Sequence, residues 1–259
     1  LGELDGRVLV LDYASDKKPR LLQHHLALNT GQAQWIQGLF IESAPNGFYL
    51  SNFVRQFSAY VTSHGFDLKP KNPKDSAQLQ QLQKAIHIYG INYVLTPRAI
   101  KGLPLLRWVP LRSGKPPYAL QRIGASALVE VLGRQPVSVP PEKWQKASAL
   151  WLNSPTRAVL IKNTQILSTA SVNTSANISN LVTDWKDGTV RFSVASTQPV
   201  PVLVKVAYFP RWRAIADGKA IPIYPASPAL MLVYAKGDVQ LKYAWAWCDY
   251  LGVALSVGS

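Results

Sequence analysis

The strongest constraint in this sequence is a change of hydrophobic period near residue 163. Beyond that point helical spacing disappears, and short apolar runs follow one another at 189–195, 202–209, 213–216, 220–224, 229–234 and 239–245. Turn-forming pairs such as Asp187-Gly188, Asp217-Gly218 and Lys236-Gly237 lie beside these runs. Asp-Gly supplies the positive φ angles of a two-residue hairpin. Short strands with regular turn signals predict an antiparallel β-sandwich.

The residues before 163 mix helical and strand character. Apolar runs predict strands at 7–12, 91–95, 105–109, 118–123, 127–132 and 157–162. Helices are expected over 20–29, over 48–61, from Asp75 or Ser76 to about Tyr89, and from Pro141 to about Leu152. The third helix stops at Gly90 and an apolar strand follows, which is typical of the second half of a βαβ unit.

The predicted fold class is therefore α+β, with two parts of different periodicity. We expect an N-terminal α/β subdomain over residues 1–165 and a C-terminal antiparallel β-sandwich over residues 166–259. The polar segment 163–180 is predicted to be a linker or an exposed edge.

The sequence contains few residues suited to catalysis. No phosphate-binding glycine loop, dinucleotide fingerprint or nucleophile elbow occurs. The only histidines are His24, His25, His64 and His87. Adjacent helical residues point about 100° apart, so His24 and His25 are poorly placed to share one metal ion. We expect no metal, no cofactor and no catalytic residue in this domain.

Four residues are candidates for ligand contact. Glu42 lies in the apolar stretch Phe-Ile-Glu-Ser-Ala-Pro, where its carboxylate is either a perturbed acid or a helix cap. Tyr208 and Trp212 suit stacking on a sugar ring, and Asp217 suits hydrogen bonds from sugar hydroxyls. The alternative for the aromatic residues is that they pack into the sandwich core.

The formal net charge of +14 does not indicate a nucleic-acid-binding arm. Basic residues outnumber acidic ones two to one throughout, with 16 against 8 in residues 1–138 and 6 against 3 in both 139–199 and 200–259. One stretch, 76–129, has no acidic residue but seven Lys and Arg. It either faces anionic lipid headgroups or a lipid-linked phosphate, or is a solvated basic face.

The two ends of the sequence suggest a membrane context. The chain begins at Leu1 and its only methionine is Met231, so we expect that residues preceding Leu1 were removed. From Tyr250 the sequence becomes increasingly apolar, as at the start of a membrane span, although an ordinary last strand also fits. Cys248 is the only cysteine, which excludes an internal disulfide.

The most informative motif covers residues 208–224. It reads as a strand, a break at Pro210, a strand carrying Trp212, an Asp217-Gly218 hairpin and a returning strand with Pro222 at its edge. This stretch resembles the C-terminal part of the extracytoplasmic region in a large family of multi-pass bacterial membrane proteins. That family is described as the pyruvoyl-tetrahydropterin-synthase-related membrane domain, or as glycosyltransferase-like membrane proteins.

Other parts of the chain resemble the same family more weakly, at residues 38–43, 90–95 and 230–256. Arg211 is a departure, since the family usually has glycine there. We expect either that the turn after Pro210 is less strained or that Arg211 faces solvent. A pterin enzyme would need three zinc-binding histidines, at least two of them closely spaced on strands, and the sequence lacks that pattern.

The resemblance implies a domain on the extracytoplasmic side of the cell membrane that leads directly into a span. Its partners would be its own transmembrane helices, the membrane surface and a lipid-linked sugar or polysaccharide, and not nucleic acid. The full-length protein would then be a candidate membrane glycosyltransferase. Two alternatives stay open: a carbohydrate-binding or adhesion module without catalysis, and a soluble enzyme that uses Glu42 or the histidines.

Overall fold

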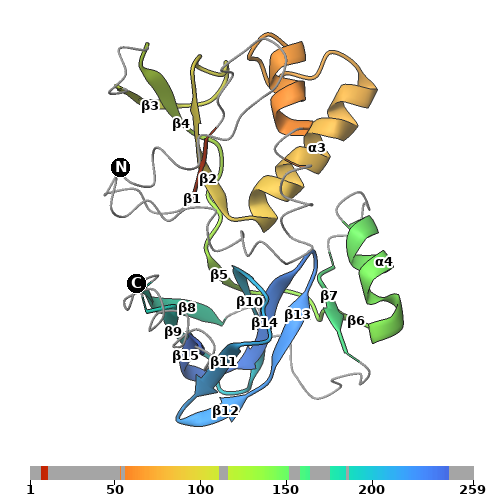
Figure 1. Ribbon diagram of the computed structural model, residues 1–259, viewed down its shortest axis with the longest axis vertical. Coiled ribbons are helices and arrows are strands. Elements are labelled where there is room, and N and C mark those ends of the chain that lie inside the picture. Colours follow the sequence, from red (N-terminus) through yellow and green to blue (C-terminus); the bar gives the residue numbers. More distant parts are fainter. Residues whose placement is uncertain are drawn as a thin grey trace, which may run out of the picture. The chain divides into compact units, whose positions relative to one another are not determined.

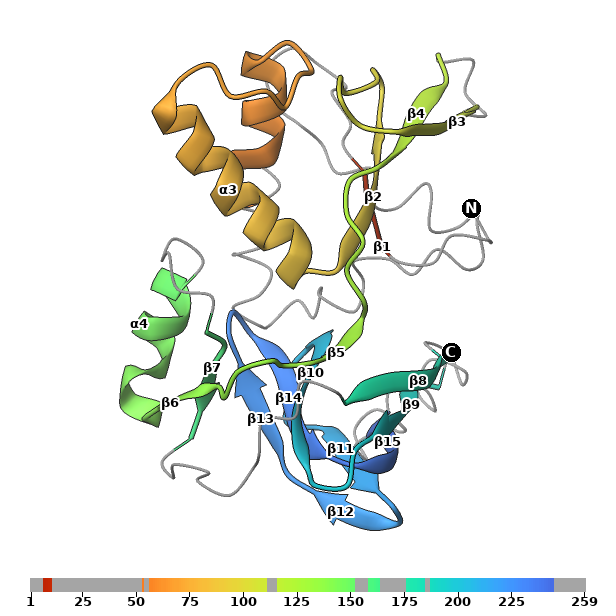
Figure 2. The ribbon, with the colours of Figure 1, turned by 180° about the vertical axis from the view of Figure 1, so that it is seen from behind.

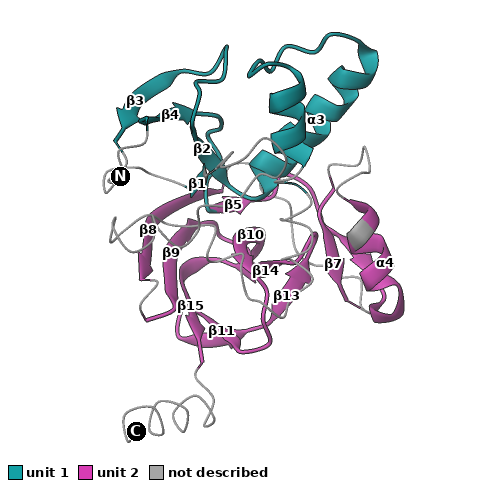
Figure 3. Ribbon diagram, turned by 45° about the horizontal axis from the view of Figure 1, so that its top comes forward, with its two compact units in different colours: residues 1–128, 152–154 teal, residues 129–151, 155–259 magenta. Residues whose placement is uncertain are grey.

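The structure, a computed structural model, describes residues 7–10, 53, 56–110, 116–151, 158–163, 176–184 and 187–244 (Figure 1). The fold is α+β, as predicted, and its strands form three sheets. The chain divides into two compact units, coloured separately in Figure 3. Unit 1 comprises residues 1–128 and 152–154, and unit 2 comprises residues 129–151 and 155–259.

Unit 1 contains a four-stranded sheet of order β1-β2-β4-β3 (Figure 2). The strands are β1 (Arg7–Val10), β2 (Ile91–Thr96), β3 (Leu105–Val109) and β4 (Tyr118–Arg122). β1 and β2 pair in parallel, while β4 runs antiparallel to both β2 and β3. Helix α3 (Pro73–Ile88) immediately precedes β2. The parallel pair with a helix before its second strand agrees with the βαβ-like unit expected from the sequence.

Helix α3 begins earlier than predicted. Its N-cap is Asn72, whose side chain accepts a hydrogen bond of 2.9 Å from the Asp75 N–H. Pro73 occupies the first turn, where its missing N–H costs nothing. The prediction that Asp75 or Ser76 caps the helix was therefore wrong, whereas the stop at Gly90 is confirmed by its φ of +64°.

Unit 2 contains two sheets. The six-stranded sheet has the order β5-β10-β14-β13-β7-β6, and the five-stranded sheet has the order β12-β11-β15-β9-β8. In chain order the strands are β5 (Val129–Val131), β6 (Val137–Val139), β7 (Leu160–Lys162), β8 (Asn177–Asp184), β9 (Thr189–Ala195), β10 (Val200–Ala207), β11 (Trp212–Ala216), β12 (Lys219–Ile221), β13 (Ile223–Ala226), β14 (Leu230–Ala235) and β15 (Gly237–Tyr243). Helix α4 (Pro141–Trp151) lies between β6 and β7 in the chain.

The change of unit falls near residue 128, whereas the sequence predicts a boundary at 165. β5 pairs with β10 in the register Val202↔Val131, so residues 129–131 join the same sheet as the C-terminal strands. Such pairing between distant segments leaves no trace in local periodicity. β8 begins within the segment 163–180 that was predicted as a linker or exposed edge and continues to Asp184, and most of its residues are exposed.

Burial patterns distinguish strands that are buried on both faces from a strand that is buried on one face only. Every residue of β10 is buried, and so is every residue of β14 except Tyr234, which is half-buried. β11 instead alternates strictly between buried and exposed residues, so only one of its faces is covered. No helix among the described residues has both the length and the apolar character needed to cross a membrane.

A charged pair lies in this apolar setting. The Lys205 side chain on β10 is fully buried, and its Nζ donates a 2.8 Å hydrogen bond to Oε2 of Glu130 on β5. Glu130 retains some exposure, so one end of the pair reaches solvent. The pair joins β5 to β10 next to the register-setting Val202↔Val131 contact.

We predict that replacing Glu130 and replacing Lys205 lower the free energy of unfolding by different amounts. Glu130→Ala should lower the free energy of unfolding by about 3 kcal/mol, because it takes a carboxylate away from a buried ammonium group. Lys205→Met should cost far less, because Met fills a similar volume and needs no counter-charge. Urea unfolding of both variants and of the double variant measures this order. An equal cost for both single variants would contradict it.

Candidate functional site

Two of the four predicted ligand-contact residues lie on the β11–β12 hairpin of unit 2, and a third lies in the connection that leads into it. Tyr208 follows β10, Trp212 opens β11, and Asp217 lies in the turn between β11 and β12. Glu42 lies outside the described residues, so nothing places it near the other three. The aromatic Tyr224, on β13, belongs to the other sheet and packs edge-on against Tyr234.

Asp217 connects two turns through hydrogen bonds with Asp238. Its φ is +46°, its N–H donates to the Asp238 carbonyl at 3.0 Å, and its Oδ1 accepts from the Asp238 N–H at 3.0 Å. Gly237, with φ of +66°, lies against this carboxylate so closely that a Cβ there would overlap it. The carboxylate thus has a structural role in holding the β11–β12 turn against the β14–β15 turn.

Trp212 belongs to the packing of the five-stranded sheet. Only 7% of the residue is exposed, and its ring meets Tyr243 edge-on with centroids 5.6 Å apart. A sugar ring stacks on an open aromatic face, which Trp212 largely lacks. Sugar contact at Tyr208, Trp212 and Asp217 stays a prediction, and the burial of Trp212 favours the core-packing alternative.

Arg211 fits its turn without strain. It is absent from the non-glycine residues with positive φ in the described part of the chain, so the turn after Pro210 does not require glycine. The Arg211 guanidinium lies 5.9 Å from the centroid of the Phe209 ring, and the residue is half-buried. The first of the two expectations for this departure from the family pattern is therefore confirmed.

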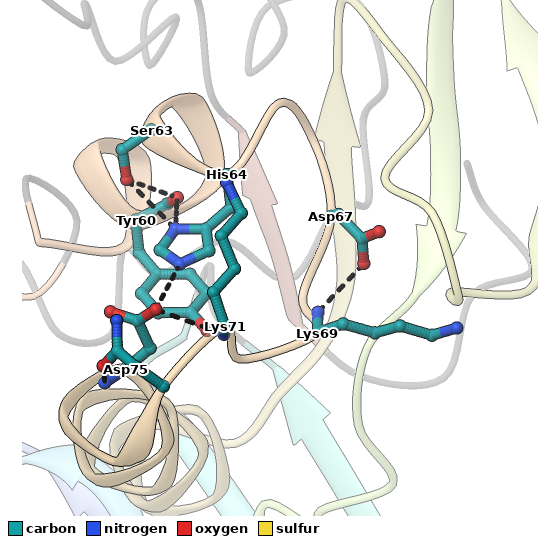
Figure 4. A network of polar contacts seen from close by, with 8 residues as sticks. Tyr60, Ser63, His64, Asp67, Lys69, Lys71 and Asp75 are labelled. Atoms are coloured by element: carbon teal, nitrogen blue, oxygen red, sulfur yellow. Dashed lines mark hydrogen bonds and ion pairs between the residues drawn. The ribbon is translucent and has the colours of Figure 1, made fainter.

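A second group of polar residues, in unit 1, was not predicted as a site. Helical residues 56–63 end beside the start of α3, and His64 faces Asp75 there (Figure 4). The His64 ring stacks on Tyr60 with centroids 4.1 Å apart, and its Nε2 lies 3.2 Å from Asp75 Oδ2. We name Tyr60, Ser63, His64 and Asp75 the His64 cluster.

The hydrogen bonds of the His64 cluster favour a structural role for Ser63 over a nucleophilic one. Ser63 Oγ lies 3.1 Å from His64 Nδ1, which superficially resembles a Ser–His–Asp arrangement. However, Nδ1 also lies 2.9 Å from the Tyr60 carbonyl oxygen, which only accepts, so a hydrogen bond there requires the proton on Nδ1, and with that proton Nδ1 is no base for Ser63. Ser63 itself donates to the same carbonyl at 3.0 Å. The group is a helix C-terminal cap.

The electrostatics of the His64 cluster agree with a stabilising contact, here called the clasp, between the end of the helix at 56–63 and the start of α3. Contact with His64 is the main cause that lowers the pKa of Asp75, and the Lys71 N–H, 3.2 Å from Oδ2, adds to this effect. Burial, with smaller effects of Asp75 and Asp67, raises the pKa of Tyr60. The Tyr60 hydroxyl is buried and has no hydrogen-bond partner among the described residues. Within those residues no three metal-binding side chains gather.

No protein-family model, no curated protein and no solved structure matches the chain. The resemblance to a membrane-protein family therefore rests on the residues of the motif at 208–224 and the weaker stretches around it. It stays a prediction.

We predict that Gly237→Ala destabilises unit 2 by about 2 kcal/mol or more, because alanine resists positive φ and its Cβ would meet the Asp217 carboxylate. Gly218→Ala is the matched control, since Gly218 also has positive φ but open space around its Cα. Thermal unfolding should show a larger loss for Gly237→Ala. Equal losses would mean that the contact between Gly237 and the Asp217 carboxylate is not tight.

We also predict a pH-dependent contribution from Asp75. A carboxyl whose pKa is lowered by folding stabilises the fold above its unfolded pKa of about 3.9, and this stabilisation disappears as the pH falls through the lower folded value. The stability difference between wild type and Asp75→Asn should therefore be full at pH 6 and shrink below about pH 4. In a His64→Gln background the difference should be smaller at every pH. A difference independent of both pH and residue 64 would refute the clasp.

Proposed function

We propose that this chain is an extracytoplasmic domain of a multi-pass bacterial membrane protein that handles envelope polysaccharide or a lipid-linked sugar. In this proposal the N-terminal α/β part and a C-terminal antiparallel β-sandwich stand beside the bilayer. The chemistry would be completed by the membrane-embedded remainder of the protein, because the described residues contain no assembled catalytic group.

The observation that carries the proposal is how the motif at 208–224 folds. Each residue type in the motif meets a structural need: Pro210 begins the turn, Trp212 fills the core, and Asp217-Gly218 makes the hairpin. Asp217 additionally accepts the Asp238 N–H from the following hairpin. The use of each of these residues in the fold gives the motif's spacing a structural basis, which supports the proposed relation to the family that shares it.

A sandwich in unit 2 is supported by contacts between its two sheets. β11 adjoins β13 and β12 adjoins β14, although the members of each pair lie in different sheets. The alternating burial of β11 fits a strand with one face on a partner sheet. The non-catalytic carbohydrate-binding alternative has less support, because its best stacking residue, Trp212, is buried.

Accessibility labelling of the full-length protein in its native bacterium tests the location. Gln198 is exposed in the turn between β9 and β10, so Gln198→Cys offers one reactive thiol once Cys248 and every cysteine in the rest of the full-length protein are replaced by Ser. A membrane-impermeant maleimide should label it in intact spheroplasts as strongly as after lysis, and the labelled protein should sediment with membranes. Val204→Cys, at a fully buried position, is the matched control and should label only after unfolding.

Labelling that requires lysis, or labelled protein in the soluble fraction, would overturn the location. The sugar-handling part of the proposal has its own readout. Deleting the gene should change the amount or composition of envelope polysaccharide, and an unchanged polysaccharide profile would remove that part while leaving the location intact.

A further inference from the structure

Strand β3 presents large apolar side chains to solvent. Leu105, Leu106 and Trp108 are 46%, 47% and 48% exposed, and among the described strands β3 pairs only with β4. Exposed apolar residues gathered on one short edge strand mark an interaction surface more often than scattered ones do. Together with the exposed cations Lys101, Arg107 and Arg122, we name this surface the β3 edge.

A β-bulge places two of these side chains on the same face. Leu105 is opposite Gln121 while Arg107 is opposite Leu120, so Leu106 is the extra residue. Trp108 is opposite Ala119, two residues from Gln121, and therefore shares a face with Leu105. Without the bulge, residues 105 and 108 would point to opposite faces. The bulge thus builds a paired Leu–Trp surface with Arg107 on the other face.

The turn before β3 is held firmly in place. The buried Gln121 side chain accepts from the Ile100 N–H at 2.6 Å and donates to the Ile100 and Leu103 carbonyls at 2.8 and 3.0 Å. The Arg122 N–H adds a 3.0 Å bond to the Pro104 carbonyl. The turn that carries Lys101 and leads into Leu105 is therefore fixed by several hydrogen bonds.

Cations outnumber acids around the β3 edge, where the one neighbouring acid among the described residues that pairs with it is Asp67, whose backbone bridges to Lys101. No Asp or Glu occurs between Asp75 and Glu130, while Arg98, Lys101, Arg107 and Arg122 are all exposed in the same sheet and its turns. An anionic partner complements these cations. A second copy of this chain would instead place like charges opposite one another.

We propose that the β3 edge docks onto the surface of an anionic lipid bilayer, with Leu105, Leu106 and Trp108 entering the headgroup region and the cations contacting lipid phosphates. Trp residues favour the membrane interface, and Lys and Arg near an anionic surface strengthen binding. The assignment rests on the proposed function, because it names the face of the domain that meets the membrane.

Vesicle co-sedimentation of the 259-residue chain tests the docking. Wild type should bind vesicles of equal parts phosphatidylglycerol and phosphatidylcholine, bind pure phosphatidylcholine far more weakly, and lose binding as salt rises. Lys101→Gln with Arg107→Gln should weaken binding about 30-fold, from about 1 kcal/mol per cation. The matched control, Arg191→Gln with Lys219→Gln, removes two exposed cations of unit 2 and should change binding far less.

The apolar part has a parallel pair of variants. Leu105→Ala, Leu106→Ala and Trp108→Ala together should weaken binding by about tenfold or more. The control Leu150→Ala, Leu181→Ala and Val182→Ala removes exposed apolar residues of unit 2 and should leave it unchanged. Circular dichroism of each variant checks that the fold is retained. Lipids with brominated chains should quench wild-type fluorescence more than that of Trp108→Phe.

Three results would overturn the docking proposal: no binding of wild type to phosphatidylglycerol vesicles, equal binding by wild type and the β3-edge variants, or wild-type dimers that the triple variant abolishes without any vesicle binding. The last result would assign the β3 edge to pairing between two copies. These failures are distinct from failure of the proposed function, since thiol labelling reports the location of the domain whether or not the β3 edge binds lipid.

Discussion

The paired strands β10 and β14 are the part of the molecule on which the rest of unit 2 depends. Both are buried almost completely, so the six-stranded sheet is built outward from an apolar centre that is covered on both faces. β5 joins through β10, and β13 and then β7 join through β14. Lys205 is tolerated within this centre because Glu130 on the adjacent strand accepts its hydrogen bond.

Much of the local structure was predictable from the sequence. The strands at 91–95, 105–109 and 189–195 coincide with β2, β3 and β9 to within a residue, because their apolar runs end at Pro, Gly or polar residues. The α3 cap was misplaced since the Asn72-Pro73 start signal was overlooked in favour of Asp75. Sheet membership was not predictable, because the Val202↔Val131 pairing joins segments about seventy residues apart.

In the candidate sites, too, the local turns were predictable from neighbouring residues, whereas the contacts between distant segments were not. That Asp217-Gly218 forms a hairpin follows from two neighbouring residues, but the bond from Asp238 to Asp217 depends on how two hairpins meet. The His64–Asp75 contact likewise joins two helices across a loop that contains Gly65 and Pro70. Its one sequence signal was a histidine at the end of a helix, where a ring N–H commonly bonds to the last carbonyls.

Two of the motif residues that suit ligand contact, Trp212 and Asp217, also serve the fold, and the His64 cluster joins two helices. What the described part of unit 1 offers outward is an apolar edge surrounded by cations. Such a surface agrees with the proposal of a domain beside a membrane, whose chemistry would be supplied by other parts of the protein.

Hydrogen–deuterium exchange of the chain, with and without phosphatidylglycerol vesicles, tests this account most directly. Docking by the β3 edge predicts slower amide exchange within residues 101–109 when vesicles are present, and unchanged exchange in β10 and β14. Protection confined to unit 2, or no protection anywhere, would contradict the claim that this domain meets a membrane through β3.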